Sequence, residues 1–196
     1  MANATTAQEL IEFNQLTKLK YDLTHFHIYD FDNFSEFLQK NNAVIAGGTV
    51  LNAVCPFKNT NYSNDIDLYT IDDPQIYENT IKYIESLGYK LHNQSKNDYE
   101  GPSQFSEYIN CVYNYVHPIH KTIIQYIVIS VEPIVHLKTF DIPACSTYYD
   151  GSYVIKNPYE IDDYYSIDFL TKKIKEIRFD KYVKRGFKFN CAYEFE

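Results

Sequence analysis

The segment from Val44 to Tyr69 constrains the fold of this chain more than any other. An apolar run at residues 44–46 ends at the pair Gly47-Gly48, and a second apolar run begins after Asn64. A short apolar run that stops at glycines is typical of a buried strand followed by a tight turn. The segment therefore predicts two strands of one sheet, joined by a short helix at 49–54 and a polar loop.

Two carboxylates lie one residue apart in the second run, Asp65-Ile66-Asp67-Leu68. Side chains on a strand alternate between its two faces, so Asp65 and Asp67 share one face and the apolar residues pack on the other. Neighbouring carboxylates repel, and a divalent cation that prefers oxygen ligands balances their charge. We therefore predict that Asp65 and Asp67 bind Mg²⁺ or Mn²⁺.

The glycine turn has two readings. In the first, Gly47 and Gly48 make a tight turn from strand to helix and do nothing more. In the second, they let the backbone approach a polyphosphate, the following helix favours the anion, and Thr49 donates its hydroxyl. The chain has neither a P-loop nor a dinucleotide-binding glycine pattern.

The rest of the chain alternates between helix and strand patterns, which predicts an α/β (α+β) fold with a mixed sheet flanked by helices. Helices are expected at 8–18, 34–39, 49–54, 74–87 and 133–138. Strands are expected at 43–46, 66–69, 89–92, 108–116, 122–130, 140–149 and 153–155, with an antiparallel hairpin at His117-Pro118-Ile119-His120. We place a core domain with N-terminal helices at 1–157 and a basic helical region packed on it at 158–196.

The basic C-terminal region stands out in a chain with a net charge of −8. Apolar residues at 167, 170, 174 and 177 predict a helix that runs from Pro158 to Gly186. Its basic residues form either an ordinary solvated face or an anion site in which Lys175 and Arg178 bind the phosphates of a nucleotide.

Composition indicates in which compartment the protein is expected. The four cysteines are widely spaced, which argues against a zinc knuckle and against a dense disulfide framework. No apolar run is long enough to span a bilayer, and the N-terminus lacks a secretory signal. We expect an intracellular, cytoplasmic protein without a membrane partner.

The combination of Gly47-Gly48-Thr49 with Asp65-Ile66-Asp67 resembles the nucleotidyltransferase superfamily, which is built on a DNA polymerase β-like palm. Segments at 124–127, 140–145 and 180–187 are similar to uncharacterised nucleotidyltransferase-like proteins of large DNA viruses. The resemblance implies transfer of a nucleoside monophosphate from an NTP to a hydroxyl acceptor on a protein, a small molecule or RNA, with two metal ions at the carboxylates. A viral source would place the protein in the host cytoplasm or in the virion.

Members of this superfamily usually have a third carboxylate on a neighbouring strand, and here the strand offers Gln125. A neutral amide contacts a nucleotide or a water but supplies no charge to a metal. Asp141 is the candidate substitute as a catalytic residue, with an ordinary structural role as its alternative. Glu107 and Glu132 are weaker candidates.

Three hypotheses follow. The first is a Mg²⁺-dependent nucleotidyltransferase, and the second is a catalytically degenerate member that serves as a nucleotide-binding or protein-interaction module, which Gln125 favours. The third is a structural or host-interaction protein that assembles through its tyrosine-rich surface, with 20 tyrosines in the chain.

Overall fold

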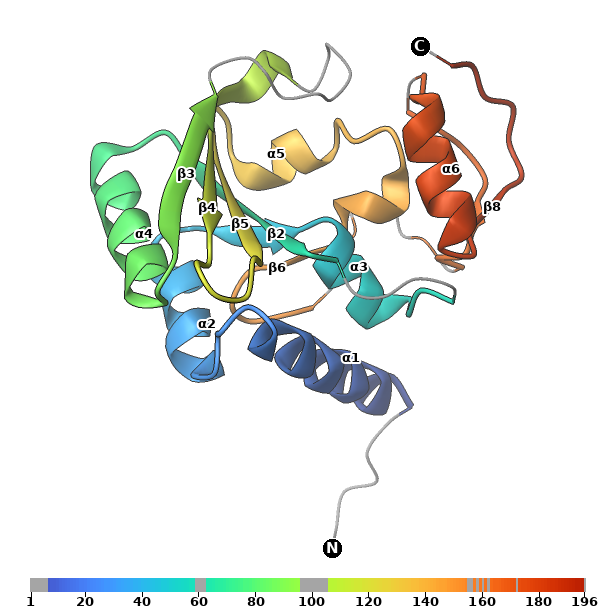
Figure 1. Cartoon of the computed structure of the whole chain (residues 1–196). Coiled ribbons are helices and arrows are strands. Elements are labelled where there is room, and N and C mark those ends of the chain that lie inside the picture. Colours follow the sequence, from blue (N-terminus) through green and yellow to red (C-terminus); the bar gives the residue numbers. More distant parts are fainter. Residues whose placement is uncertain are drawn as a thin grey trace, which may run out of the picture.

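A six-stranded mixed sheet forms the centre of the computed structural model, which describes residues 7–58, 63–95, 106–154, 157, 159, 161, 163–171 and 173–195 (Figure 1). The strand order is β3-β4-β5-β2-β1-β6. The strands are β1 Val44–Ala46, β2 Asp65–Ile71, β3 Lys90–Ser95, β4 Ile109–Val116, β5 Ile123–Ile129 and β6 Tyr148–Tyr149. A small second sheet pairs β7 Ser166–Ile167 with β8 Lys188–Phe189.

The helices surround the six-stranded sheet. They are α1 Ala7–Thr24, α2 Phe31–Lys40, α3 Gly48–Val54, α4 Pro74–Ser86, α5 Pro133–Leu137 and α6 Glu176–Lys184, with short 3₁₀ turns η1 Ser106–Tyr108 and η2 Pro143–Ser146. In Figure 1 the sheet separates α2 and α4 from α5 and α6. The predicted α/β class, with a mixed sheet flanked by helices, is confirmed.

The strand order places the two segments of the predicted site, the end of β1 and the start of β2, side by side within the sheet. β2 runs antiparallel to β1, with Ala46 opposite Asp67, and parallel to β5, with Asp67 beside Gln125. β4 and β5 form the antiparallel hairpin that the sequence predicts. The turn after β1 therefore lies beside the start of β2.

The two faces of the sheet have separate cores. Ile66, Leu68 and Tyr126 belong to the core that includes buried residues of α1, α2 and α4. Tyr69 and Ile127 belong to the second core, which includes buried residues of α5, η2 and α6. Because side chains alternate along a strand, Asp65 and Asp67 lie on the same face as Tyr69 and turn toward the α6 side.

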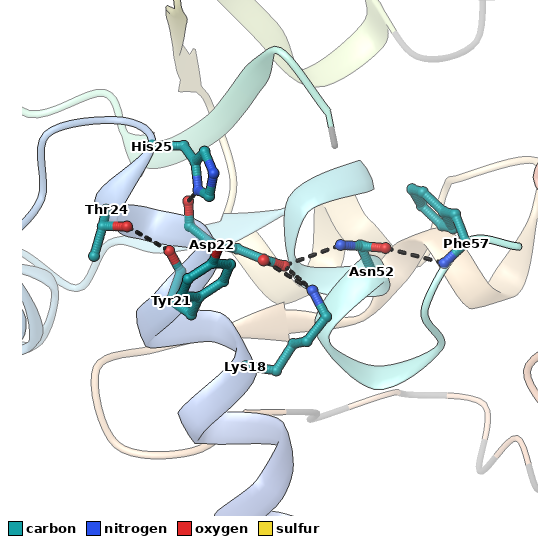
Figure 2. A network of polar contacts seen from close by, with 7 residues as sticks. All are labelled: Lys18, Tyr21, Asp22, Thr24, His25, Asn52 and Phe57. Carbon is teal, nitrogen blue, oxygen red and sulfur yellow. Dashed lines mark hydrogen bonds and ion pairs between the residues drawn. The ribbon is translucent and has the colours of Figure 1, made fainter. Parts of the chain in front are cut away.

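A buried polar network fixes α3 and the loop after it to α1 (Figure 2). Asp22 is 2% exposed, and its carboxylate accepts hydrogen bonds from Lys18 Nζ at 2.8 and 2.7 Å and from Asn52 Nδ2 at 2.9 Å. Asn52 Oδ1 in turn accepts from the backbone N–H of Phe57 at 3.0 Å. The network holds Phe57 in place, and Phe57 contacts the site described below.

Helix ends follow ordinary capping chemistry, and two helices are longer than expected. Asp73 caps α4, since its Oδ1 accepts from the backbone N–H groups of Gln75 and Ile76 at 2.8 and 2.9 Å. The helix expected at 34–39 begins earlier, because Asp30 caps it by accepting from the N–H of Asn33 at 3.0 Å. α1 extends beyond the expected residue 18 to Thr24.

The strand expected at 140–149 is wrong for most of its length. Residues 143–146 form the turn η2, and only the last two residues join the sheet, as β6. The turn begins at Pro143, and two side-chain hydrogen bonds stabilise its end. Ser146 Oγ donates to Pro143 O at 2.6 Å, and Thr147 Oγ1 donates to Ala144 O at 2.8 Å.

The long helix expected from Pro158 to Gly186 is also wrong in its first part. Pro158 is outside the described residues, and none of the residues that the structure describes between 159 and 175 is helical. Ile167 pairs in β7 and Ile174 forms a bridge with Phe195, whereas Ile177 is 80% exposed. The apolar spacing therefore arises from extended segments, and helix forms only in α6, which ends before Gly186 at φ +96.

Candidate functional site

Asp67 lies directly against the glycine turn. Gly47 has φ +75, which is a left-handed conformation that favours glycine. A Cβ at this position would overlap Oδ2 of Asp67. The sequence pattern of glycine turn and paired aspartates thus corresponds to one compact site in the structure.

Asp65 is tied to the same turn through its backbone and its side chain. Thr49 Oγ1 donates to the carbonyl oxygen of Asp65 at 2.8 Å, and Ser63 Oγ donates to Asp65 Oδ1. Thr49 is buried, so in this structure its hydroxyl joins α3 to β2. The hydroxyl of Ser63, which sequence reasoning did not single out, sits beside Gly48, where a Cβ would be 2.9 Å from Ser63 Oγ.

Burial raises the pKa of Asp67 from 3.8 to about 7, and the charge of Asp65 adds to this effect. The positive charges of Lys181, Arg178 and Arg185 act in the opposite direction. Two hard oxygen ligands with an unfavourable shared charge are a donor set that fits Mg²⁺ or Mn²⁺. The residues present therefore fit the cation that the sequence predicts.

Asp141 is held in an ion pair. It is fully buried, and both of its carboxylate oxygens accept from Arg178 Nε, at 3.0 and 2.8 Å. Its Oδ1 also accepts from the N–H of Ile142 at 2.8 Å. Two predicted site residues, Asp141 and Arg178, thus bind each other, and the pair attaches α6 to the segment before η2.

The guanidinium of Arg185, which the sequence did not single out, is buried beside the glycine turn. Arg185 is 6% exposed, and its guanidinium stacks on Phe57 at 4.2 Å and Tyr182 at 5.2 Å. Its Nη1 is buried without a hydrogen-bond partner among the described residues, and it would be 3.5 Å from a Cβ on Gly48. A desolvated donor beside a glycine turn is suited to an anionic oxygen.

The basic residues whose charges lower the pKa of Asp67 lie along one side of α6 and at the residue that follows it. Arg178, Lys181 and Arg185 are spaced three and four residues apart, which brings them together on a helix. Lys175 is the residue before the helix and is not among the charges that act on Asp67. The spacing of residues 178, 181 and 185 was the sequence signal that could have grouped these three side chains. It places them on one face of a helix only when the bounds of that helix are known.

Gln125 begins a row of amide side chains that crosses the sheet from Asp67. Asp67, Gln125, Asn114 and Asn93 are register partners on β2, β5, β4 and β3. Gln125 Nε2 donates to Asn114 Oδ1 at 3.0 Å, and Asn114 Nδ2 donates to Asn93 Oδ1 at 2.7 Å. The position next to Asp67 is therefore neutral and already hydrogen-bonded.

Glu107 and Glu132 lie at the other end of the sheet. Glu107 precedes β4, whose first residue pairs with Ile129, and Glu132 follows β5 and accepts from Asn42 Nδ2 at 2.9 Å. Asp65, in contrast, pairs with Ile123 at the start of β5. Six residues of strand, or roughly 20 Å, separate the two ends, which places both glutamates away from the carboxylate pair.

No helix in the described part of the chain is long and apolar enough to cross a membrane.

The fold and the site define a class of protein: an α/β protein with paired carboxylates on a central strand, a glycine turn against them and a basic helix opposite. The model of the Gad2 family, the Gabija anti-defense 2 family proteins, matches residues 15–166. The chain belongs to this family. No curated protein matches the chain.

Proposed function

We propose that this protein binds a nucleoside triphosphate with Mg²⁺ or Mn²⁺ at Asp65 and Asp67 and transfers a nucleoside monophosphate to a hydroxyl acceptor. The acceptor is a protein, a small molecule or RNA. One observation carries the proposal: a carboxylate pair meets, at the same glycine turn, a buried arginine nitrogen that has no hydrogen-bond partner among the described residues. A nucleotide with its metal ion satisfies both groups.

Each group has a distinct part in this proposal. Asp65 and Asp67 would hold the metal, which would supply positive charge to the phosphates and lower the pKa of the acceptor hydroxyl. Arg185 would donate from Nη1 to a phosphate oxygen, in a place where desolvation strengthens the bond. Gly47 and Gly48 leave room for the phosphates, and Phe57 and Tyr182 hold the guanidinium in its orientation.

The family name gives the proposal a biological setting. Gad2 proteins are named for action against Gabija defense. We propose that this chain has that role and exercises it through the carboxylate site, inside the cell where NTPs and Mg²⁺ are present. In a host that carries Gabija defense, the wild-type protein would then weaken defense, and the Asp65→Asn/Asp67→Asn double variant would not.

A second candidate is a degenerate member that binds nucleotide without turnover. Two observations favour it: Gln125 supplies no charge beside Asp67, and Asp141 is already paired with Arg178. Such a protein would act as a nucleotide-binding or protein-interaction module.

Turnover separates the two candidates. Purified protein is incubated with Mg²⁺ and each of the four NTPs labelled at the α-phosphate, together with cell extract as a source of acceptors. Label transferred to an acceptor, with release of pyrophosphate, is expected from the enzyme and must disappear in the double variant. Nucleotide binding without any transfer would reject the enzyme and leave the binding module.

A further inference from the structure

Three histidines from two distant parts of the sequence meet at one end of the sheet. His27 follows α1, and His117 and His120 flank the turn between β4 and β5. Their ring centroids are 4.1 Å apart for His27 and His117, 4.2 Å for His27 and His120, and 4.9 Å for His117 and His120. One ring nitrogen from each lies within 4.8 Å of the others.

We infer that His27, His117 and His120 form a binding site for a divalent transition metal of the Zn²⁺ type. Imidazole nitrogen is a ligand that Zn²⁺, Co²⁺, Ni²⁺ and Cu²⁺ favour, whereas Mg²⁺ and Ca²⁺ favour oxygen. Three histidines with one further position open to water is a common ligand set for zinc.

The hydrogen bonding of His27 leaves one of its ring nitrogens available to bind a metal ion. Its Nδ1 lies 3.1 Å from the hydroxyl oxygen of Tyr29, which can accept a hydrogen bond from a protonated Nδ1. Its Nε2 is buried and has no hydrogen-bond partner in the described part of the chain. A proton on Nδ1 leaves the lone pair of Nε2 available, which is the usual arrangement of a histidine ligand with a second partner.

The backbone and the surroundings also agree with a built site. His27 has φ +62, an uncommon conformation for a residue other than glycine, and it places the imidazole over His117. Burial lowers the pKa of His27, and the neighbouring His117 and His120 lower it further.

Binding of a metal ion requires the ring nitrogens of the three histidines to move closer together. Ligand nitrogens around tetrahedral zinc are about 3.3 Å apart, so the present separations of up to 4.8 Å must shorten. His120 is exposed and lies in a turn, so its side chain can rotate inward. His117 Nδ1 would give up its contacts with the N–H groups of Ile119 and His120, which are long at 3.4 and 3.3 Å.

This site is separate from the carboxylate pair. His117 follows β4 with the same alternation as Tyr115, whose side chain lies in the core with Ile66 and Leu68. The ring of Tyr89, in the same core, packs edge-on against His117 at 5.3 Å. The histidines therefore gather on the face of the sheet opposite to Asp65 and Asp67.

The test uses the full chain after EDTA treatment and dialysis at pH 7.5. ZnCl₂ is titrated by calorimetry, and CoCl₂ is titrated by visible absorption, because four-coordinate Co²⁺ absorbs far more strongly than hydrated Co²⁺. We expect a single metal ion per chain. Replacing the exposed ligand, His120→Gln, should weaken binding by about tenfold or more, and His27→Gln should do the same.

Two controls make the result specific. His92 is exposed on β3 and outside the cluster, so His92→Gln should bind metal as the wild type does. The Asp65→Asn/Asp67→Asn variant should also retain Zn²⁺. The inference is overturned if wild-type protein binds neither metal, if His120→Gln binds as tightly as His92→Gln, or if binding is lost in the aspartate variant. Circular dichroism of each variant excludes loss of binding through unfolding.

Discussion

Replacing Asp67 by Asn should stabilise the metal-free protein, although the carboxylate lies at the centre of the proposed site. The fold raises the pKa of Asp67 from 3.8 to about 7, mainly through burial and secondly through Asp65. Such a carboxyl group binds its proton more tightly in the folded state than in the unfolded state. Its contribution to the free energy of unfolding therefore falls as the pH rises from about 4 to about 7 and is constant above that range.

The size of the effect follows from the two pKa values. Each tenfold change in proton affinity is worth about 1.4 kcal/mol, so the ionised side chain costs the folded state about 4 kcal/mol at most. Asp67 is only partly buried, and relaxation and solvent reduce this figure, so we expect a gain of about 2–4 kcal/mol for Asp67→Asn at pH 8. At pH 4 the gain should be below about 1 kcal/mol, since the carboxyl group is then largely protonated in the fold.

The assay is urea denaturation in EDTA at pH 4 and pH 8, followed by circular dichroism. Asp180→Asn, an exposed change on α6, is the matched control and should remain within about 0.5 kcal/mol of the wild type. Excess Mg²⁺ should narrow the difference at pH 8, because it binds the wild-type fold and not the variant. An Asp67→Asn protein no more stable than wild type at pH 8, or one with the same gain at both pH values, would refute the reasoning.

Three further predictions concern the surroundings of the carboxylates. Arg185→Leu keeps the apolar contact with Phe57 but removes the buried Nη1. The affinity for NTP should therefore fall about 10–100-fold in a calorimetric titration, while the urea midpoint changes little. Unchanged NTP affinity would contradict the proposed contact between Arg185 and a phosphate. Asp141→Asn leaves Arg178 without its buried partner and should cost about 2–4 kcal/mol in urea denaturation; a neutral effect would show that the pair does not hold α6 in place. Gln125→Asp adds a charge beside Asp67 and should raise Mg²⁺ affinity about tenfold by calorimetry; weaker binding would mean that the β5 position does not reach the metal.

The sequence predicted the centre of the fold well, because the signals there are local. The apolar run before Gly47, the alternation around Asp65 and Asp67, and the helical pattern of residues 74–87 each depend on neighbouring residues alone. These patterns placed β1, β2 and α4 correctly. The carboxylates also lie on the face of β2 opposite to Ile66 and Leu68, as the alternation predicted.

The C-terminal third was predicted less well, because long-range pairing decides its structure. Thr171 bonds to the carbonyl oxygen of Phe140 through its hydroxyl at 2.5 Å and to that of Asp141 through its N–H at 3.1 Å. Ile174 bonds to Glu194 through its backbone N–H. These contacts keep Thr171 and Ile174 out of a helix despite the helical spacing of the apolar residues in this segment.

Long-range contacts also decide two features of the site, so the sequence pattern alone could not predict them. The partner of Arg178 is 37 residues away, and only the fold shows that Asp141 is engaged there. The guanidinium of Arg185 stacks on Phe57, whose position follows from the network around Asp22. A sequence supplies the charges of such a site, but the packing decides which of them face each other.

The central claim is that Asp65 and Asp67 hold a metal–nucleotide complex, and one titration tests it most directly. Purified protein is titrated with a non-hydrolysable NTP, with and without Mg²⁺, beside the Asp65→Asn/Asp67→Asn double variant, whose folding is verified by circular dichroism. We predict binding that requires Mg²⁺ and is lost in the variant. Absence of binding by the wild-type protein with either Mg²⁺ or Mn²⁺, or equal binding by the variant, would contradict the account.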